Sequence, residues 1–119
     1  MRRIIVCGSR RWNDRATIET KLYDLALRYG SDLTIVHGGA KGADRIAEQE
    51  AQKAGLLIER HDPEYHRYGP KKAPLVRNER MAALGADLCV AFWDGRSTGT
   101  AHMMRCAGLQ DIPVEVVAG

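Results

Sequence analysis

The chain has 119 residues, of which 45% are hydrophobic and 28% charged, and its formal net charge is +3. This length suits one folded domain spanning residues 1–119, and the composition is that of a water-soluble globular protein. The longest apolar runs hold about five residues, far below the roughly 20 that a membrane span needs. No signal-peptide pattern precedes Gly8. We therefore expect a cytoplasmic domain that is not bound to a membrane, and the mild charge does not by itself demand a nucleic-acid partner.

Short apolar runs alternate with helical patterns along the whole chain. The apolar runs predict strands over residues 4–7, 33–36, 56–60, 88–92 and 114–117. Apolar residues at helical spacing predict helices over residues 14–29, 43–54, 75–84 and 100–107, and glycines follow the first three of these helices. Residues 61–74 contain three prolines and show no periodicity, so they are predicted to form a long loop.

This alternation predicts an α/β fold of the Rossmann-like type. Its three layers are a five-stranded parallel sheet with helices on both faces, joined by right-handed crossovers. The third and fifth strands carry the charged residues Glu59, Arg60 and Glu115, as edge strands often do, which favours the strand order 3-2-1-4-5. In such a sheet, ligands bind beyond the carboxyl ends of the strands, where the strand order reverses between strands one and four.

The stretch over residues 35–44 holds the strongest local signal. A strand ends at His37, three glycines follow (Gly38, Gly39 and Gly42), and a helix pattern then begins. Glycines permit sharp turns and a close approach of backbone to ligand, and a helix start attracts anions such as phosphate. The spacing is neither Gly-x-Gly-x-x-Gly nor that of a P-loop. A plain strand-to-helix turn that binds nothing is the alternative.

Three glycine-containing turns, residues 8–10, 37–44 and 94–100, follow strands one, two and four and should converge at one edge of the sheet. Together they predict a site for a phosphate-bearing ligand, completed by residues 77 and 78 of the third helix. Thr98 and Thr100 are also candidate N-caps of the last helix. The candidate ligand-binding residues are Gly8, Ser9, Arg10, His37, Gly38, Gly39, Ala40, Gly42, Ala43, Asp44, Arg77, Asn78, Asp94, Gly95, Arg96, Thr98, Gly99 and Thr100.

For several of these residues, the sequence leaves two interpretations of their role open. Asp44 could accept a hydrogen bond from a ribose hydroxyl, or it could orient its own turn and favour the helix dipole. His37 is either a ligand contact or a satisfied core histidine. Arg77 could bind phosphate in a bidentate manner or be a surface charge on its helix. Asn78 could contact a base or hold a loop.

The segment 61–74 has its own alternatives. Aromatic and basic residues are interleaved there, which suits a lid that stacks on a base, although an ordinary solvated loop fits equally well. These residues are Tyr65, His66, Tyr68, Lys71 and Lys72.

We expect neither a metal nor a cofactor. His61, Asp62 and His66 stand in a proline-broken segment without any ligand register. Cys7, Cys89 and Cys106 form no Cys-x-x-Cys pair and are expected to be buried, reduced thiols.

Four motifs together carry a resemblance to a known family. They are residues 7–10 (CGSR), 37–44 (HGGAKGAD), 76–78 (VRN) with Met81, and 94–100 (DGRSTGT). This set resembles the SLOG superfamily of Rossmann-like domains, which includes LOG and DprA proteins, and is most similar to its YspA/YpsA-related branch. The resemblance implies recognition of a nucleotide or a nucleotide-derived ligand.

The resemblance implies three kinds of function. Some relatives sense a ligand, some cleave the N-glycosidic bond of nucleoside monophosphates, and some bind DNA. The hydrolases carry Pro-Gly-Gly-x-Gly-Thr-x-x-Glu after strand four, whereas here Met103 follows Gly99 and Thr100 in place of the glutamate. Because glycosidic cleavage benefits from a positioned carboxylate, this departure favours a binding protein or sensor. A LOG-like phosphoribohydrolase and a DprA-like single-stranded nucleic acid binder are the alternatives.

An assembly is expected as well. Related domains often pair through the helices that flank the sheet. Met103 and Met104 could supply soft apolar contacts there, so we expect a homodimer or a larger homo-oligomer.

Overall fold

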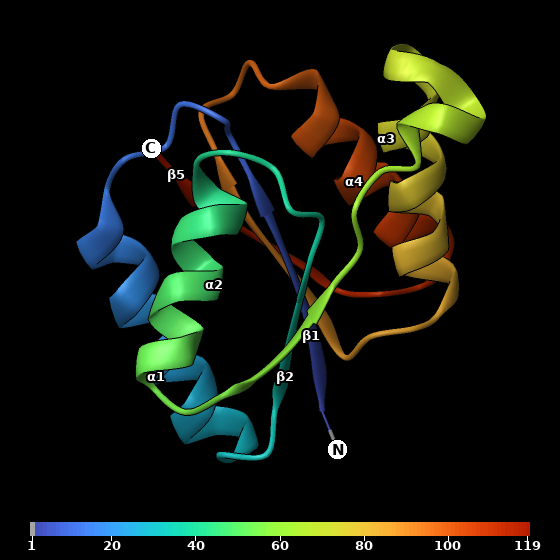
Figure 1. Ribbon diagram of the computed structural model, residues 1–119. Helices are drawn as coiled ribbons and strands as arrows, with labels where there is room; N and C mark the ends of the chain where they lie inside the picture. Colours follow the sequence, from blue (N-terminus) through green and yellow to red (C-terminus); the bar gives the residue numbers. More distant parts are fainter. Residues whose placement is uncertain (1) are drawn as a thin grey trace.

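A computed structural model describes residues 2–119 and shows one parallel sheet between two layers of helices (Figure 1). The strand order is β3-β2-β1-β4-β5, as predicted. Residues pair in register across the sheet, so that Ile5 of the central strand lies beside Val36 on one side and Cys89 on the other. The strands are β1 (Arg3–Gly8), β2 (Thr34–His37), β3 (Leu57–Arg60), β4 (Leu88–Trp93) and β5 (Val114–Ala118).

The helices cover the two faces of the sheet in pairs. The first face is covered by α1 (Arg15–Tyr29) and α2 (Ala43–Lys53). The second face is covered by α3 (Tyr65–Ala83) and α4 (Thr98–Leu109). This is the predicted three-layer α/β sandwich.

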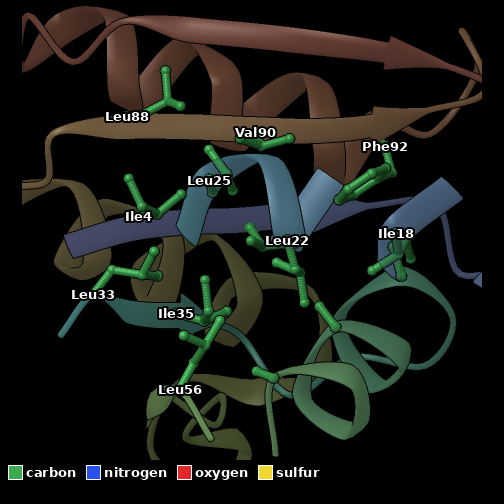
Figure 2. Close-up of a cluster of buried hydrophobic side chains, with 14 of the residues drawn as sticks. Ile4, Ile18, Leu22, Leu25, Leu33, Ile35, Leu56, Leu88, Val90 and Phe92 are labelled. Carbon is green, nitrogen blue, oxygen red and sulfur yellow. The ribbon is translucent and has the colours of Figure 1, made fainter. Parts of the chain in front are cut away.

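Two separate hydrophobic cores lie on the two sides of the sheet, because successive side chains of a strand point to opposite faces. Along β4, Val90 and Phe92 enter the core beneath α1 and α2, whereas Cys89 and Ala91 enter the core beneath α3 and α4. Figure 2 shows the first core, in which α1 side chains pack over the central strands. Burial of each large side chain contributes about 1.5–3 kcal/mol, so this packing fixes where the strand ends lie.

The edge strands carry the polar residues that the sequence assigned to them. On β3, Glu59 accepts hydrogen bonds from Arg3 and His61. On β5, Glu115 forms ion pairs with Lys21 and Arg28 of α1. Their side chains stay partly exposed, which a central position between two strands would not allow.

The prediction of a loop over residues 61–74 is wrong, because α3 begins at Tyr65. A short first segment ends at Gly69, whose φ of 82° and ψ of 171° break the helix, and Pro70 then opens the longer segment. Proline is favoured at the first position of a helix, where its missing N–H costs nothing. Pro70 therefore marks a helix start, and Pro74 is accommodated in the second turn after the break.

Two expectations for α4 also need correction. Its N-cap is Ser97, whose hydroxyl accepts from the Thr100 amide at 3.4 Å, rather than Thr98 or Thr100. Met103 is only 1% exposed and belongs to the core beneath α3 and α4, so it offers no surface for an oligomer contact. Met104 is partly buried against the same core.

The three cysteines are buried and form no disulfide. The sulfur of Cys7 lies 4.0 Å from that of Cys89 on the neighbouring strand. This hydrogen bond and burial together raise the pKa of Cys7 well above its ordinary value. Within residues 2–119, no helix is both long enough and apolar enough to cross a membrane.

Candidate functional site

A cavity of about 870 Å³ opens at the carboxyl ends of the central strands. The turns after β1, β2 and β4 line it together with α3 and α4. The cavity thus lies where the strand order of the sheet reverses, between β1 and β4. These turns lie at the top of Figure 1. The predicted residues that line the cavity are Gly8, Ser9, Arg10, Gly38, Ala40, Asp44, Arg77, Asn78, Asp94, Arg96, Thr98, Gly99 and Thr100.

The remaining predicted residues, His37, Gly39, Gly42, Ala43 and Gly95, do not line the cavity. Lys71, named above only as part of a possible lid, also lines the cavity. Sequence reasoning did not include the other lining residues in the site: Val6, Cys7, Arg11, Pro74, Leu75, Met81, Ser97, His102, Met103 and Arg105. Helical spacing could have identified part of this set. Thr98, His102 and Arg105 recur three and four residues apart, which places them on one face of α4.

The β2–α2 turn is held together by Asp44, which is 5% exposed. Its Oδ2 accepts hydrogen bonds from the Gly38 amide at 2.9 Å and from the Ala40 amide at 3.3 Å. Burial raises the pKa of Asp44, and the hydrogen bonds from these amides and the nearby guanidinium of Arg77 oppose the rise. The turn therefore satisfies two of its own amides with an internal carboxylate rather than leaving them open to a ligand.

His37 completes the same turn from within the core, where it is fully buried. Its Nδ1 lies 3.0 Å from the Gly39 amide, which donates to it, so Nε2 carries the ring proton and donates to Glu48 at 3.1 Å. His37 is thus a satisfied core histidine. Gly42, with φ +76°, packs against the backbone of Ser9, and the adjacent Ala43 amide donates to the Ser9 carbonyl at 3.2 Å.

The β4–α4 turn is organised differently. Asp94 Oδ1 accepts from the amides of Arg96 and Ser97, both at 2.8 Å, while Oδ2 accepts from the Ser9 hydroxyl at 3.0 Å. These backbone hydrogen bonds lower the pKa of Asp94. Beyond the turn, the amides of Thr98 and Gly99 have no acceptor among residues 2–119.

Those two amides belong to the first two residues of α4, a helix of twelve residues. A Cβ added to Gly99 would meet no atom within 4 Å, so the approach to this backbone is unobstructed. The positive end of a helix dipole and two open N–H groups form a ready anion site. The start of α4 is therefore better suited to phosphate than the β2–α2 turn is.

Arg77 links α3 to the β2–α2 turn. Its guanidinium donates to the Gly38 carbonyl and, through Nε, to Asn78 Oδ1 at 2.8 Å. Burial lowers the pKa of Arg77, and the nearby Asp44 carboxylate acts in the opposite direction. Asn78 in turn contacts His102 Nδ1 at 3.1 Å. Arg77 is thus a half-buried structural link at the cavity wall, not a free surface charge.

Basic side chains are distributed unevenly over the molecule. Half of the 18 lysines and arginines form ion pairs with carboxylates: Arg2, Arg3, Arg15, Lys21, Arg28, Lys53, Arg60, Arg67 and Arg80. The other half have no carboxylate partner in the described chain: Arg10, Arg11, Lys41, Arg45, Lys71, Lys72, Arg77, Arg96 and Arg105. All of the unpaired ones belong to the turns and helices around the cavity, and most of them line it.

Two further features complete the chemistry of the site. The wall formed by α3 and α4 includes the exposed side chain of Leu75 and the polar pair Asn78 and His102, while Met81 and Met103 are each only 1% exposed. Burial lowers the pKa of His102, which favours a neutral imidazole. Among residues 2–119, no group of three or more His, Cys, Asp or Glu side chains is placed to hold a metal ion.

Comparisons with known proteins agree with the fold. The chain is 45% identical to the Gene 61 protein of Mycobacterium phage D29 over 121 residues, covering 96% of this chain and 94% of that protein. It superposes on DNA processing protein A (DprA) from Streptococcus pneumoniae with a TM-score of 0.81 at 20% identity. A DprA structure from Helicobacter pylori, described for its single-stranded DNA binding mode, gives a TM-score of 0.69 at 23% identity.

The two DprA structures extend well beyond the shared fold. This chain is covered almost entirely, at 100% and 97%, but it spans only 51% and 64% of those proteins. Residues 2–68, which contain β1 to β3 and the β2–α2 turn, match the family described as YspA, cpYpsA-related SLOG (YAcAr). The chain belongs to this SLOG family.

Proposed function

We propose that this protein binds a nucleotide or nucleotide-derived ligand in the cavity and serves as a binding protein or sensor. The observation that carries the proposal is the unpaired positive charge of the cavity beside the open amides of Thr98 and Gly99. Arginines without a carboxylate partner are costly to keep together unless an anion offsets their repulsion. A phosphate group supplies that anion and accepts from both arginine and helix-start amides.

Other lining residues of the cavity suit the nucleoside part of the ligand. Leu75 of α3, which is 41% exposed, and the half-buried Pro74 present apolar surface against which a base can pack. Asn78 and His102 add hydrogen-bonding groups at its edge. Membership of a SLOG family favours the same class of ligand. Phosphate at the α4 start and base against α3 and α4 is thus the arrangement we propose.

The experiment is a calorimetric titration with nucleoside mono-, di- and triphosphates. We expect the double variant Arg10→Ala/Arg96→Ala to weaken binding by about tenfold or more, since each charged hydrogen bond contributes about 1.5–3 kcal/mol. The matched control is Arg2→Ala, which removes an exposed arginine just before the amino end of β1, whereas the cavity lies at the carboxyl ends of the strands. No binding at millimolar nucleotide, or equal losses in the two proteins, would overturn the proposal.

A second candidate is the binding of single-stranded nucleic acid, which the exposed arginines at the cavity rim favour. Arg10, Arg11, Arg96 and Arg105 are all exposed and unpaired, as a surface that follows a phosphate backbone requires. The H. pylori DprA is described by such a binding mode. Oligonucleotide affinity that falls steeply with salt, together with weak mononucleotide binding, would favour this candidate.

We expect little or no glycosidic-bond hydrolysis. Asp44 and Asp94 are the carboxylates that line the cavity among the described residues, and both hold backbone amides. Met103 contributes no acid or base. Nucleoside monophosphates incubated with the protein should release free base, followed by chromatography, far below about 1 s⁻¹. Rapid base release that is lost in Arg77→Ala would instead establish a phosphoribohydrolase.

A further inference from the structure

One polar atom of the cavity is left open by the interactions within the chain. Asp44 Oδ2 accepts both turn amides, while Oδ1 has no hydrogen-bond donor among residues 2–119. In that part of the chain, Arg3 Nη2 is the side-chain nitrogen or oxygen that is completely buried without a partner. Oδ1 of Asp44 is therefore not sealed in the core. Because Asp44 lines the cavity and is only 5% exposed, the cavity is where a ligand can reach this carboxyl group.

Resting on the proposed nucleotide-binding function, we propose that Asp44 Oδ1 accepts a hydrogen bond from the 2′ or 3′ hydroxyl of the ligand's sugar and makes the site selective for free nucleotides that carry this hydroxyl. A carboxylate oxygen is an acceptor that repels phosphate and attracts a hydroxyl donor. A buried carboxylate fixed by two amides presents this acceptor in one orientation, without the loss of side-chain freedom that a surface residue would undergo on binding.

The position of Asp44 relative to the anion site fits the sugar rather than the base. The adjacent Ala43 amide bonds the Ser9 carbonyl, and the Ser9 hydroxyl bonds Asp94 at the start of the β4–α4 turn. Two short hydrogen-bonded steps thus connect Asp44 to the α4 turn that we propose for phosphate. The exposed apolar side chain of Leu75 comes from α3 and stands apart from this chain of contacts. A sugar joins phosphate and base in the same order.

The proposal also separates the two candidate functions. Within a DNA strand the 2′ position lacks a hydroxyl and the 3′ oxygen is esterified, so neither can donate to Asp44. A site that depends on this acceptor should bind free ribonucleotides in preference to DNA. Sites built to hydrogen-bond a hydroxyl reject the analogue that lacks it, because their buried polar atom is then left unpaired.

The test compares ribonucleotides with their 2′-deoxy and 3′-deoxy forms by calorimetric titration of the wild type and Asp44→Asn. Asparagine can keep both turn amides on its single oxygen while presenting an N–H donor to the cavity instead of an acceptor. We expect at least one deoxy form to bind about tenfold or more weakly to the wild type, and this preference to disappear in Asp44→Asn. The control Asp62→Asn, an exposed acid outside the cavity, should retain the preference.

The outcomes distinguish this inference from the function on which it rests. Equal affinity for the ribo and both deoxy forms in the wild type overturns the role of Asp44 while nucleotide binding stands. A preference that persists in a folded Asp44→Asn protein, verified by circular dichroism, overturns it as well. Failure of every nucleotide to bind overturns both proposals.

Discussion

Two of the glycine-containing turns at the cavity differ in whether groups of the chain itself accept hydrogen bonds from their amides. In the β2–α2 turn, the amides of Gly38, Gly39 and Ala40 all donate to side chains of the chain itself. In the β4–α4 turn, Asp94 and Ser97 hold the loop but leave the amides of Thr98 and Gly99 open. Similar turn residues on one sheet edge thus produce a closed turn and an open one. Glycine content indicates a sharp turn, whereas anion binding depends on which donors remain unused.

The largest effect that tests this contrast is expected from Asp44→Ala. Removing the carboxylate leaves the Gly38 and Ala40 amides without an acceptor in a buried place, which should lower the free energy of unfolding by about 3 kcal/mol. Asp44→Asn, which can keep both amides on one oxygen, should lose much less. Urea unfolding of both variants measures this difference. Equal losses would mean that the turn does not depend on the internal acceptor.

The open turn is tested by Thr98→Pro. Thr98 is the first residue of α4, where proline is favoured, and Ser97 before it has φ −58° and ψ 116°, which proline accepts in its neighbour. The substitution deletes one open N–H without breaking the helix. We expect about tenfold weaker nucleotide binding with nearly unchanged stability.

Thr98→Ala is the matched control, because it shortens the side chain but keeps the N–H, and it should bind as the wild type does. Calorimetric titration and thermal unfolding of the two variants give both readouts. Wild-type affinity in a folded Thr98→Pro protein would remove the α4 start from the site.

A smaller effect is expected from removing the α4 cap with Ser97→Ala. Loss of an N-cap hydroxyl costs about 1 kcal/mol of stability, and fraying of the first turn should also weaken nucleotide binding. Asp14→Ala removes the corresponding cap of α1, whose carboxylate accepts from the Thr17 amide at 3.1 Å and does not line the cavity. Similar losses of stability with weakened binding in Ser97→Ala alone would locate the anion site at α4. Weakened binding in both would contradict it.

The smallest effect concerns acid stability. Backbone hydrogen bonds lower the pKa of Asp94, so its contribution is present above the unfolded pKa of about 3.9 and is lost as the pH falls through the folded pKa. Burial raises the pKa of Asp44, so its ionisation penalises the folded state at higher pH, and acid relieves that penalty. The two turns therefore respond to acid with opposite signs.

Urea unfolding at about pH 5 and pH 3 should accordingly show a smaller acid-induced loss for Asp94→Asn than for the wild type, and a larger loss for Asp44→Asn. Parallel losses in all three proteins would show that neither turn carries a titration of this kind.

Much of the fold followed from local pattern. Uninterrupted apolar runs such as that of β4 predicted buried parallel strands, and the charged residues Glu59 and Glu115 identified the edges of the sheet. The error lay at α3, where prolines indicated a loop. Pro70 in fact stands at a helix start. The local sequence alone does not distinguish a proline that ends a helix from one that begins it, and here the backbone conformation of Gly69, which interrupts the helix, decides between the two.

The candidate site was likewise predictable in part from the sequence. The sequence by itself determined which turns reach the sheet edge, because strand order fixes where the carboxyl ends converge, and most predicted residues of those turns do line the cavity. Only the tertiary structure decided that Asp44 and His37 occupy the amides of one turn, and that His102 and Arg105 face the cavity from α4. Hydrogen bonds and cavity walls depend on distances between elements, and spacing within one segment carries no record of those distances.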